Sequence, residues 1–178
     1  MLVSLFRRRS AGEALALYRV AVAQARAEAF YRRLGVPDSV DGRFELVALH
    51  LWLLCRRLKG EPTAARFLQE LVEVFFADMD VSLRELGAAD IGVGRRVKRM
   101  VEAFHGRAAA YDGALAAGTP ALREALARNL YGTVASEPAQ LDAMAAYVGE
   151  AEARLASQPE TNLLAGRASF PPPPGAVP

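Results

Sequence analysis

The sequence contains a single cysteine, Cys55, and no apolar segment long enough to cross a membrane. One thiol excludes an intramolecular disulfide framework and a thiolate metal cage, and its apolar surroundings indicate a buried side chain. The longest apolar run, Phe44 to Cys55, contains Glu45 and His50 and is shorter than the roughly 18–20 residues of a bilayer-spanning helix. Residues 7–9 are arginines that follow apolar residues, without a signal-peptide cleavage pattern. We therefore expect a cytoplasmic protein, at most peripheral to the inner membrane.

Motifs for catalysis and for phosphate binding are also lacking. Gly92 and Gly94 have neither a preceding strand nor the third glycine of a dinucleotide-binding loop. Asp78 and Asp80 are two residues apart, so on a helix their carboxylates point about 200° apart and do not form an acid–base pair. The serines at candidate helix starts have no histidine nearby in sequence. We expect that the protein is not an enzyme.

The sequence has two histidines, His50 and His105. A metal or haem site needs ligands that converge on one point, and these two converge only if their helices cross there. His50 lies among leucines, which favours a hydrogen-bonded histidine in the core. We therefore expect no metal and no cofactor.

The pattern of apolar residues and helix-ending residues predicts an all-α fold, because no segment alternates apolar and polar residues as a strand does. Ser10 with Glu13 is typical of a capping box, and Asp41 is a good N-cap for an all-round apolar central helix. Asp80 or Ser82 is expected to start a short turn that closes at Gly87. The expected helices run approximately over residues 11–34, 41–59, 62–79, 90–117, 119–132 and 136–157.

These elements predict one irregular helical bundle of about six helices. We divide the chain into a basic N-terminal segment (1–10), a helical domain (11–158) and a flexible proline-rich C-terminal tail (159–178). The tail lacks apolar periodicity and contains four consecutive prolines, which is typical of mobile or polyproline-like chain.

The charge pattern leaves two binding hypotheses open. The basic stretch Arg95, Arg96, Lys98 and Arg99 could contact phosphates of RNA on the ribosome, although no interleaved aromatic residues provide a stacking platform. The apolar and arginine residues of segment 1–9 could dock weakly on anionic lipid. The simpler alternative is that these charges lie on solvated helix faces. We expect no DNA partner.

Two stretches are specific enough to suggest a family. The first runs from Phe30 to Glu45 and continues into the leucine-rich segment after His50. The second runs from Asp78 through Lys98 to Arg107. Together they resemble the ubiquinol–cytochrome c chaperone family, over about residues 24–117.

The resemblance implies a chaperone that binds newly made cytochrome b and supports assembly of the cytochrome bc1 complex. It also implies, for mitochondrial members, a small partner protein and work at the ribosomal exit. An RNA- or ribosome-binding helical module is the alternative function.

Chaperones of membrane proteins cover apolar client surface reversibly, which suits an apolar groove with a charged rim. We expect the apolar part of such a client-binding groove to come from Trp52, Phe75, Phe76 and Met79. We expect its rim to come from Asp38, Asp41, Arg43, Asp78, Asp80, Arg84 and Lys98. The alternative for each apolar residue is a place in the core.

Overall fold

The computed structural model describes residues 2–85, 90–132 and 134–175, without the side chains of residues 2–9 and 90–96. The described residues form eight helices and no strands, so the all-α, single-domain prediction is confirmed. Two of the eight helices have five residues each, which explains the excess over the six expected. The helices are α1 (Leu2–Ala25), α2 (Glu28–Arg32), α3 (Val40–Leu58), α4 (Ala65–Glu85), α5 (Asp90–Ala117), α6 (Thr119–Asn129), α7 (Pro138–Ala156) and α8 (Glu160–Leu164).

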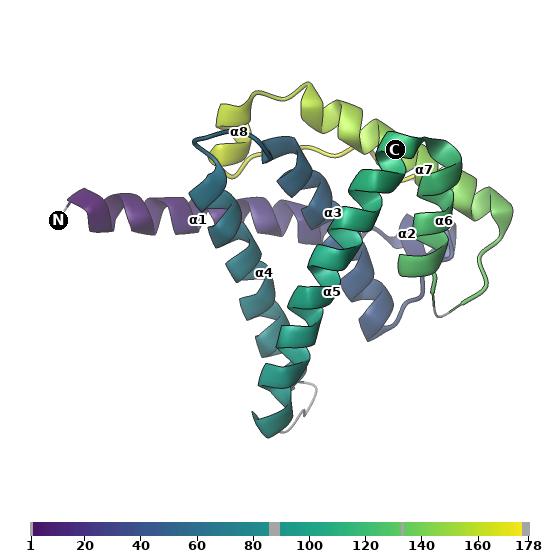
Figure 1. The fold of residues 1–178 in the computed structure, drawn as a ribbon, viewed down its shortest axis with the longest axis horizontal. Helices are drawn as coiled ribbons and strands as arrows, with labels where there is room; N and C mark the ends of the chain where they lie inside the picture. The colour runs from purple at the N-terminus through teal and green to yellow at the C-terminus, as the bar shows by residue number, and fades with distance from the viewer. Residues whose placement is uncertain (1, 86–89, 133, 176–178) are drawn as a thin grey trace.

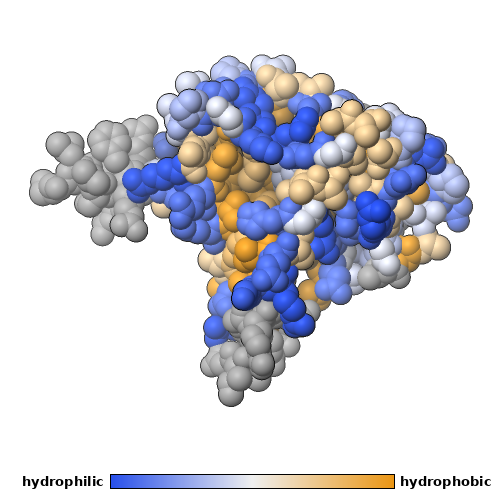
Figure 2. Space-filling model, viewed as in Figure 1, coloured by the Kyte–Doolittle hydropathy of each residue, from blue (hydrophilic) through white to orange (hydrophobic). Residues whose placement is uncertain are grey.

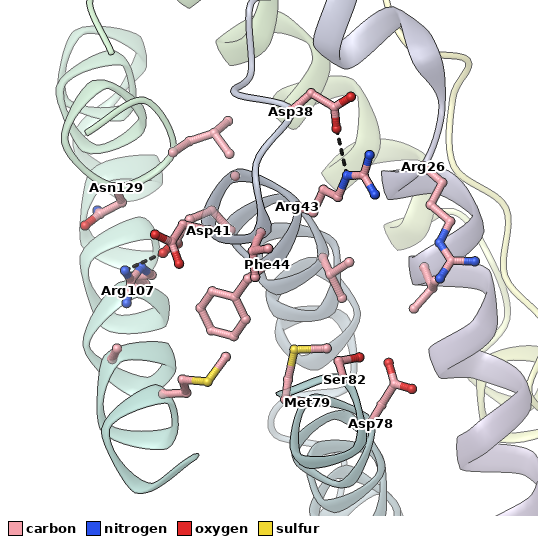
Figure 3. Close-up of a pocket in the computed structure, with 18 of the residues that line it drawn as sticks. Arg26, Asp38, Asp41, Arg43, Phe44, Asp78, Met79, Ser82, Arg107 and Asn129 are labelled. Carbon is pink, nitrogen blue, oxygen red and sulfur yellow. Dashed lines mark hydrogen bonds and ion pairs between the residues drawn. The ribbon is translucent and has the colours of Figure 1, made fainter. Parts of the chain in front are cut away.

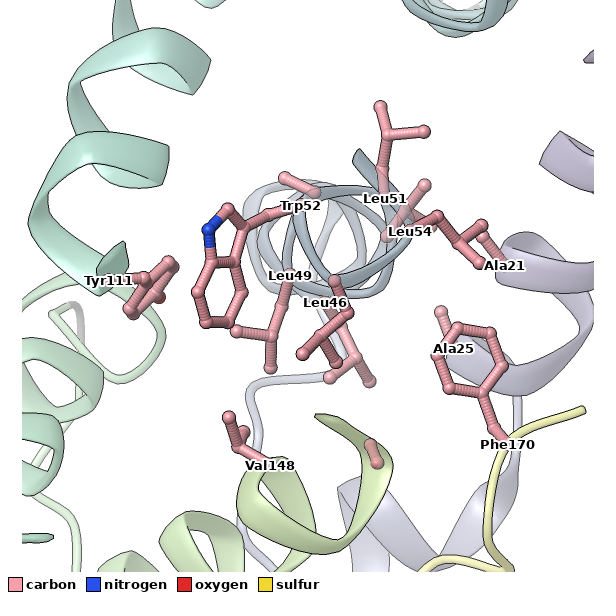
Figure 4. Close-up of a cluster of buried hydrophobic side chains, with 14 of the residues drawn as sticks. Ala21, Ala25, Leu46, Leu49, Leu51, Trp52, Leu54, Tyr111, Val148 and Phe170 are labelled. Carbon is pink, nitrogen blue, oxygen red and sulfur yellow. The ribbon is translucent and has the colours of Figure 1, made fainter. Parts of the chain in front are cut away.

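Helix α3 is the centre of the fold, as its apolar residues on every side predict. Figure 4 looks along α3 and shows its side chains pointing outward in several directions, towards α1, α5, α7 and the C-terminal segment. Leu46, Leu49, Leu51 and Leu54 are completely buried. The helix begins after Ser39, whose Oγ accepts a hydrogen bond from the Gly42 amide at 3.1 Å. The N-cap is therefore Ser39, and the prediction of Asp41 is wrong.

The other helices surround α3 in an irregular arrangement (Figure 1). Helices α1, α5 and α7 contact α3 directly, α1 packs along α4, and α6 packs between α5 and α7. Helices α4 and α5 form an antiparallel pair that extends beyond the rest of the molecule. This pair and the start of α3 frame the surface that concerns function.

The first predicted helix is wrong at both ends. It begins near the N-terminus, so Ser10 is inside α1 and its hydroxyl donates to the Glu70 carboxylate of α4 instead of capping a helix. At its other end the helix stops at Ala25, and a separate helix, α2, follows it. The Tyr31 hydroxyl donates to the Ala25 carbonyl at 2.8 Å, which satisfies one of the carbonyls left free by the break.

Helix α4 continues to Glu85, so the predicted turn does not begin at Asp80 or Ser82. Asp80 instead forms a 2.7 Å ion pair with Arg84 one turn later, an arrangement that supports a continuous helix. Gly87, where that turn was expected to close, lies outside the described residues.

The predicted starts of the last three long helices are close to those observed. Helix α5 begins at Asp90, and α6 begins at Thr119 with Pro120 in its first turn. Helix α7 begins at Pro138 after a capping box, in which the Glu137 amide donates to the Gln140 side chain at 3.1 Å.

The expectation of a flexible tail from residue 159 is corrected for residues 159–175. Helix α8 packs against α1, and the chain after it returns along the molecule. Phe170 is 8% exposed and its ring meets the His50 ring edge-on, with centroids 5.1 Å apart. Pro171 and Pro173 are also buried. One aromatic anchor and a hydrogen bond from Gln24 to the Pro171 carbonyl (2.8 Å) attach this segment, which periodicity could not reveal. Residues 176–178 lie outside the described residues.

Candidate functional site

A pocket of about 1280 Å³ opens where the start of α3 meets α1, α4, α5 and α6. Figure 3 shows α3 in its centre, Met79, Ser82 and Asp78 of α4 below it, and Arg107 and Asn129 on one wall. Its apolar lining includes Val22, Phe44, Val47, Met79, Leu83, Met100 and Leu130. Its charged lining includes Asp38, Asp41, Arg43, Asp78, Arg99 and Arg107. An apolar floor with a rim of both charge signs suits an amphipathic or largely apolar binding partner.

The start of α3 is held by a close backbone contact. A Cβ atom on Gly42 would lie 2.0 Å from the Pro37 carbonyl oxygen, so this position excludes any side chain. Asp38 and Arg43 form an ion pair of 2.7 Å across the same turn. The hydrogen bond from Arg43 lowers the pKa of Asp38 below its ordinary value. Both side chains are more than half exposed, so this pair shapes the rim but contributes little to stability.

Asp78 connects α4 to α1 on the opposite side of the pocket. The Tyr18 hydroxyl donates to its carboxylate at 2.6 Å. Burial, followed by this hydrogen bond to an anion, raises the pKa of Tyr18 far above its ordinary value. Tyr18 therefore stays a hydrogen-bond donor at all physiological pH values, and Asp78 is held at the rim.

A polar group inside the pocket comes from α3 and α5. Arg107 donates through Nη2 to Glu45 Oε1, and its guanidinium lies 6.0 Å from the centroid of the Phe44 ring. The Glu45 side chain is 11% exposed and that of Arg107 is 25% exposed. Burial raises the pKa of Glu45 from 4.5 to about 7, although the Arg107 charge acts in the opposite direction.

Polar atoms without partners gather beside this ion pair. Glu45 Oε2, Arg107 Nε, the Tyr111 hydroxyl and Asn129 Nδ2 are buried and have no hydrogen-bond partner among the described residues. Tyr111 is one turn beyond Arg107 on α5, and Asn129 is the last residue of α6. A buried polar atom without a partner is costly, so such atoms mark a place where a further polar group is favourable.

The structure brings five of the predicted groove residues together. Asp38, Asp41, Arg43, Asp78 and Met79 line the pocket. They come from α3, the loop before it and α4, which the sequence alone could not place side by side.

Two of the predicted apolar groove residues are in the core. Phe75 is fully buried and stacks on Phe44, with ring centroids 5.6 Å apart. Trp52 is 2% exposed, packs against Tyr111, and donates from Nε1 to Asp112 at 3.0 Å. Phe75 does not line the pocket itself, but it packs against Phe44, which does.

The remaining predicted groove residues lie outside the pocket lining. Phe76 is half-buried against Phe104, Asp80 is paired with Arg84, and Lys98 is exposed. Figure 2 shows apolar surface gathered between α4 and α5 on the face seen in Figure 1, with hydrophilic residues around it. The half-buried apolar residues of α4 are Leu68, Val72, Val74, Phe76 and Met79.

The basic stretch and the N-terminal segment are described in part. Arg99 lines the pocket, whereas the side chains of Arg95 and Arg96 lie outside the described residues. The side chains of residues 2–9, expected to dock on lipid, also lie outside them. Within the described part of the chain, no helix is both long and apolar enough to cross a membrane.

His50 occupies the core position that its leucine neighbours predict, with both ring nitrogens hydrogen-bonded at 2.7 Å. His105 is exposed and touches the edge of Phe104. Among the residues with described positions, no group of three or more histidine, cysteine or acidic side chains is arranged to hold a metal ion.

Sequence reasoning missed three polar residues of the pocket, Glu45, Arg107 and Asn129, and the buried Tyr111 hydroxyl. Glu45, Arg107 and Tyr111 all lie in or just after the family-like stretches, but nothing in the sequence singled out their roles. Asn129 lies outside those stretches, and no feature of the sequence indicated a role for it. A charged residue inside an apolar helix, as Glu45 is in α3, was the one available indication.

Comparison with known proteins relates the chain and its fold to a family. The model of the ubiquinol–cytochrome C chaperone family matches residues 32–170. The chain is 40% identical to the Cbp3 homolog from Brucella abortus, whose crystal structure superposes with a TM-score of 0.82 over 96% of each chain.

Animal proteins are more distant relatives. Ubiquinol-cytochrome-c reductase complex assembly factor 1 of Xenopus laevis is 24% identical over 136 residues, covering 76% of this chain and 68% of that protein. The human protein of the same name is 25% identical over 161 residues, covering 89% of this chain and 54% of that protein. This chain thus spans roughly half to two thirds of the length of these relatives. The match of the family model to most of the chain shows that the chain belongs to the ubiquinol–cytochrome c chaperone family.

Proposed function

We propose that this protein is an assembly factor for the ubiquinol–cytochrome c reductase complex and that it binds newly made cytochrome b as its client. The family and the names of its relatives support the first part. The role requires binding and release of a client and no covalent chemistry.

The observation that carries the proposal is the pocket at the start of α3. Its volume of about 1280 Å³ exceeds that of typical small-molecule sites. Two of its lining residues, Met79 and Met100, are flexible and polarizable, which lets one surface fit different apolar side chains. A segment of an integral membrane protein, before insertion, offers surface of this kind.

The charged rim supports reversible rather than permanent binding. Acidic Asp38, Asp41 and Asp78 and basic Arg43 and Arg99 all line the pocket. Rim charges act mainly on association rate and on the choice of partner, while the apolar floor supplies affinity. A chaperone needs this combination because it must release the client for assembly.

The test is complementation of a deletion strain with wild-type protein, Met79→Asp or Val81→Asp. Met79 lines the pocket, whereas Val81, two residues later on the same helix, is 52% exposed and outside it. Each variant introduces one carboxylate into α4 near residue 80, so Val81→Asp is a matched control. Membranes are analysed by reduced-minus-oxidised spectra and by immunoblotting for cytochrome b.

We expect loss of cytochrome b and of its haem signal with Met79→Asp and normal levels with Val81→Asp. Transcript levels and the circular dichroism of both purified variants must match those of wild type. Normal cytochrome b in the deletion strain itself would refute the proposed function. Loss in the deletion strain but full rescue by Met79→Asp would retain the assembly role and remove the pocket from it.

A further inference from the structure

The pocket has a chemically distinct end, formed by Glu45, Arg107 and Asn129. All three residues line the pocket, and each has a buried polar atom without a hydrogen-bond partner among the described residues. Apolar Phe44 and Leu130, adjacent in sequence to Glu45 and Asn129, also line the pocket, as do charged Asp41 and Arg128. Polar atoms concentrated at one end of an apolar pocket determine which ligand binds there and in what orientation.

These atoms have a definite hydrogen-bonding character. When Glu45 is ionised, its Oε2 is an acceptor, because a carboxylate has no proton to donate and Oε1 already accepts from Arg107 Nη2. Arg107 Nε and Asn129 Nδ2 are donors. The site therefore offers one acceptor and two donors to any group that enters.

We propose that this end of the pocket recognises a neutral carboxamide, the side chain of an Asn or Gln in an otherwise apolar client segment. A carboxamide has both an N–H donor for Glu45 Oε2 and a carbonyl oxygen for Arg107 Nε and Asn129 Nδ2. The inference rests on the proposed function, because it specifies what the client presents to the pocket.

Charged groups match the site less well. A client carboxylate would accept from Arg107 and Asn129, but it would place a second negative charge against Glu45. A client ammonium would donate to Glu45 and leave both donors without an acceptor. With Glu45 ionised, the Glu45–Arg107 ion pair is neutral as a unit, so a neutral partner avoids an uncompensated buried charge.

A side chain is a better source of the amide than the client backbone. Segments destined for a membrane are helical, and the backbone amides within a helix are already hydrogen-bonded to one another. Only polar side chains then remain available for recognition. Entry of the group needs a rotation of the Glu45 carboxylate, whose terminal torsion is soft.

The experiment measures binding of fluorescein-labelled, leucine-rich helical peptides that differ at one central position, which is Gln, Leu, Glu or Lys. Fluorescence anisotropy is recorded for the full chain as wild type, Met79→Asp, Asn129→Ala and Arg107→Lys. Arg107→Lys keeps the positive charge beside Glu45 but removes Nε. Asn162→Ala, in α8 outside the pocket, is the matched control. Circular dichroism confirms that each variant is folded.

We expect wild type to bind the Gln peptide about tenfold more tightly than the Leu, Glu and Lys peptides. Asn129→Ala and Arg107→Lys should lose most of this preference and still bind the Leu peptide as wild type does, while Asn162→Ala keeps it. Equal affinity for the Gln and Leu peptides would overturn the inference and leave the proposed function intact. A preference for the Gln peptide that persists in both Asn129→Ala and Arg107→Lys would also overturn the inference and leave the proposed function intact.

Failure of the pocket as the client-binding site has a different signature. If Met79→Asp leaves binding of every peptide unchanged, the pocket is not the client site, and both proposals for it are wrong. If Met79→Asp abolishes binding of all peptides but no preference for Gln exists, only the carboxamide inference is wrong.

Discussion

The Tyr147 hydroxyl donates a hydrogen bond of 2.7 Å to Nε2 of His50, between α7 and α3. The other ring nitrogen, Nδ1, lies 2.7 Å from the Leu46 carbonyl, so it must carry the proton and donate to that oxygen. Gln24 of α1 donates to the Tyr147 hydroxyl at 3.0 Å and to the Pro171 carbonyl at 2.8 Å. One buried polar chain thus joins α1, α3, α7 and the C-terminal segment, and it fixes His50 as a neutral ring.

The first prediction concerns the protonation of His50. Burial lowers its pKa from 6.5 to about 4. Because the folded state binds the proton less tightly than the unfolded state, the stability from neutral His50 is complete above pH 6.5 and is lost as pH falls towards 4. The loss amounts to roughly 3 kcal/mol of unfolding free energy. Urea unfolding of wild type and His50→Gln at pH 7 and pH 4.5 measures this loss. The difference in unfolding free energy between wild type and variant should be smaller at pH 4.5. A difference independent of pH would contradict the buried neutral ring.

The second prediction concerns Glu45 and has the opposite sign. Burial raises its folded-state pKa from 4.5 to about 7, so the folded state binds the proton more tightly than the unfolded state. Its contribution to stability is therefore complete below pH 4.5 and is lost as pH rises through about 7, by roughly 3 kcal/mol. Glu45→Gln keeps the shape and removes the titration. The unfolding free energy of wild type relative to this variant should fall between pH 5 and pH 8. A constant difference would show that Arg107 keeps Glu45 ionised throughout.

The sequence predicted helices best where their ends carry local signals. Helices α6 and α7 begin at Thr119 and Pro138, because proline in the first turn and a capping box act within a few residues. Helix α1 was mispredicted because Ser10 could cap a helix locally, but its hydroxyl bonds to Glu70 sixty residues away. The C-terminal segment was missed for the same reason. Phe170 gains its place from His50, a contact that no local pattern encodes.

Some of the residues that line the pocket were predicted, and the limit is again long-range geometry. Asp38 and Arg43 are close in sequence, so their place on one rim could be anticipated. That Trp52 and Phe75 are buried while Met79 reaches the pocket depends on how α4 packs against α1 and α5. Apolar periodicity predicts which face of a helix packs against the rest of the protein. It does not predict where along the helix this packing ends and the side chains reach a pocket or the solvent.

The third prediction tests the attachment of the C-terminal segment. Phe170→Ala removes a ring that is 8% exposed and leaves a cavity beside His50, so we expect a loss of about 3 kcal/mol in unfolding free energy. Pro172→Ala, two residues later and exposed, is the control and should change stability by less than about 0.5 kcal/mol. Both are measured by urea unfolding followed by circular dichroism. Equal stability of the two variants would mean that the segment does not anchor through Phe170.

The last prediction concerns Gly42 at the start of α3. A methyl group there would lie 2.0 Å from the Pro37 carbonyl oxygen, a backbone atom that cannot move without displacing the Asp38–Arg43 turn. Gly149, inside α7, has no atom within 4 Å of the corresponding position. Gly149→Ala should therefore stabilise the protein by about 0.5–1 kcal/mol, as alanine does in a helix interior. Gly42→Ala should destabilise it by about 1–3 kcal/mol, because overpacking forces a backbone shift. It should also weaken client binding by disturbing the rim, whereas Gly149→Ala should bind normally. Thermal unfolding and the peptide-binding assay on the two variants test both effects, and a stabilising Gly42→Ala would mean that the loop before α3 yields without cost.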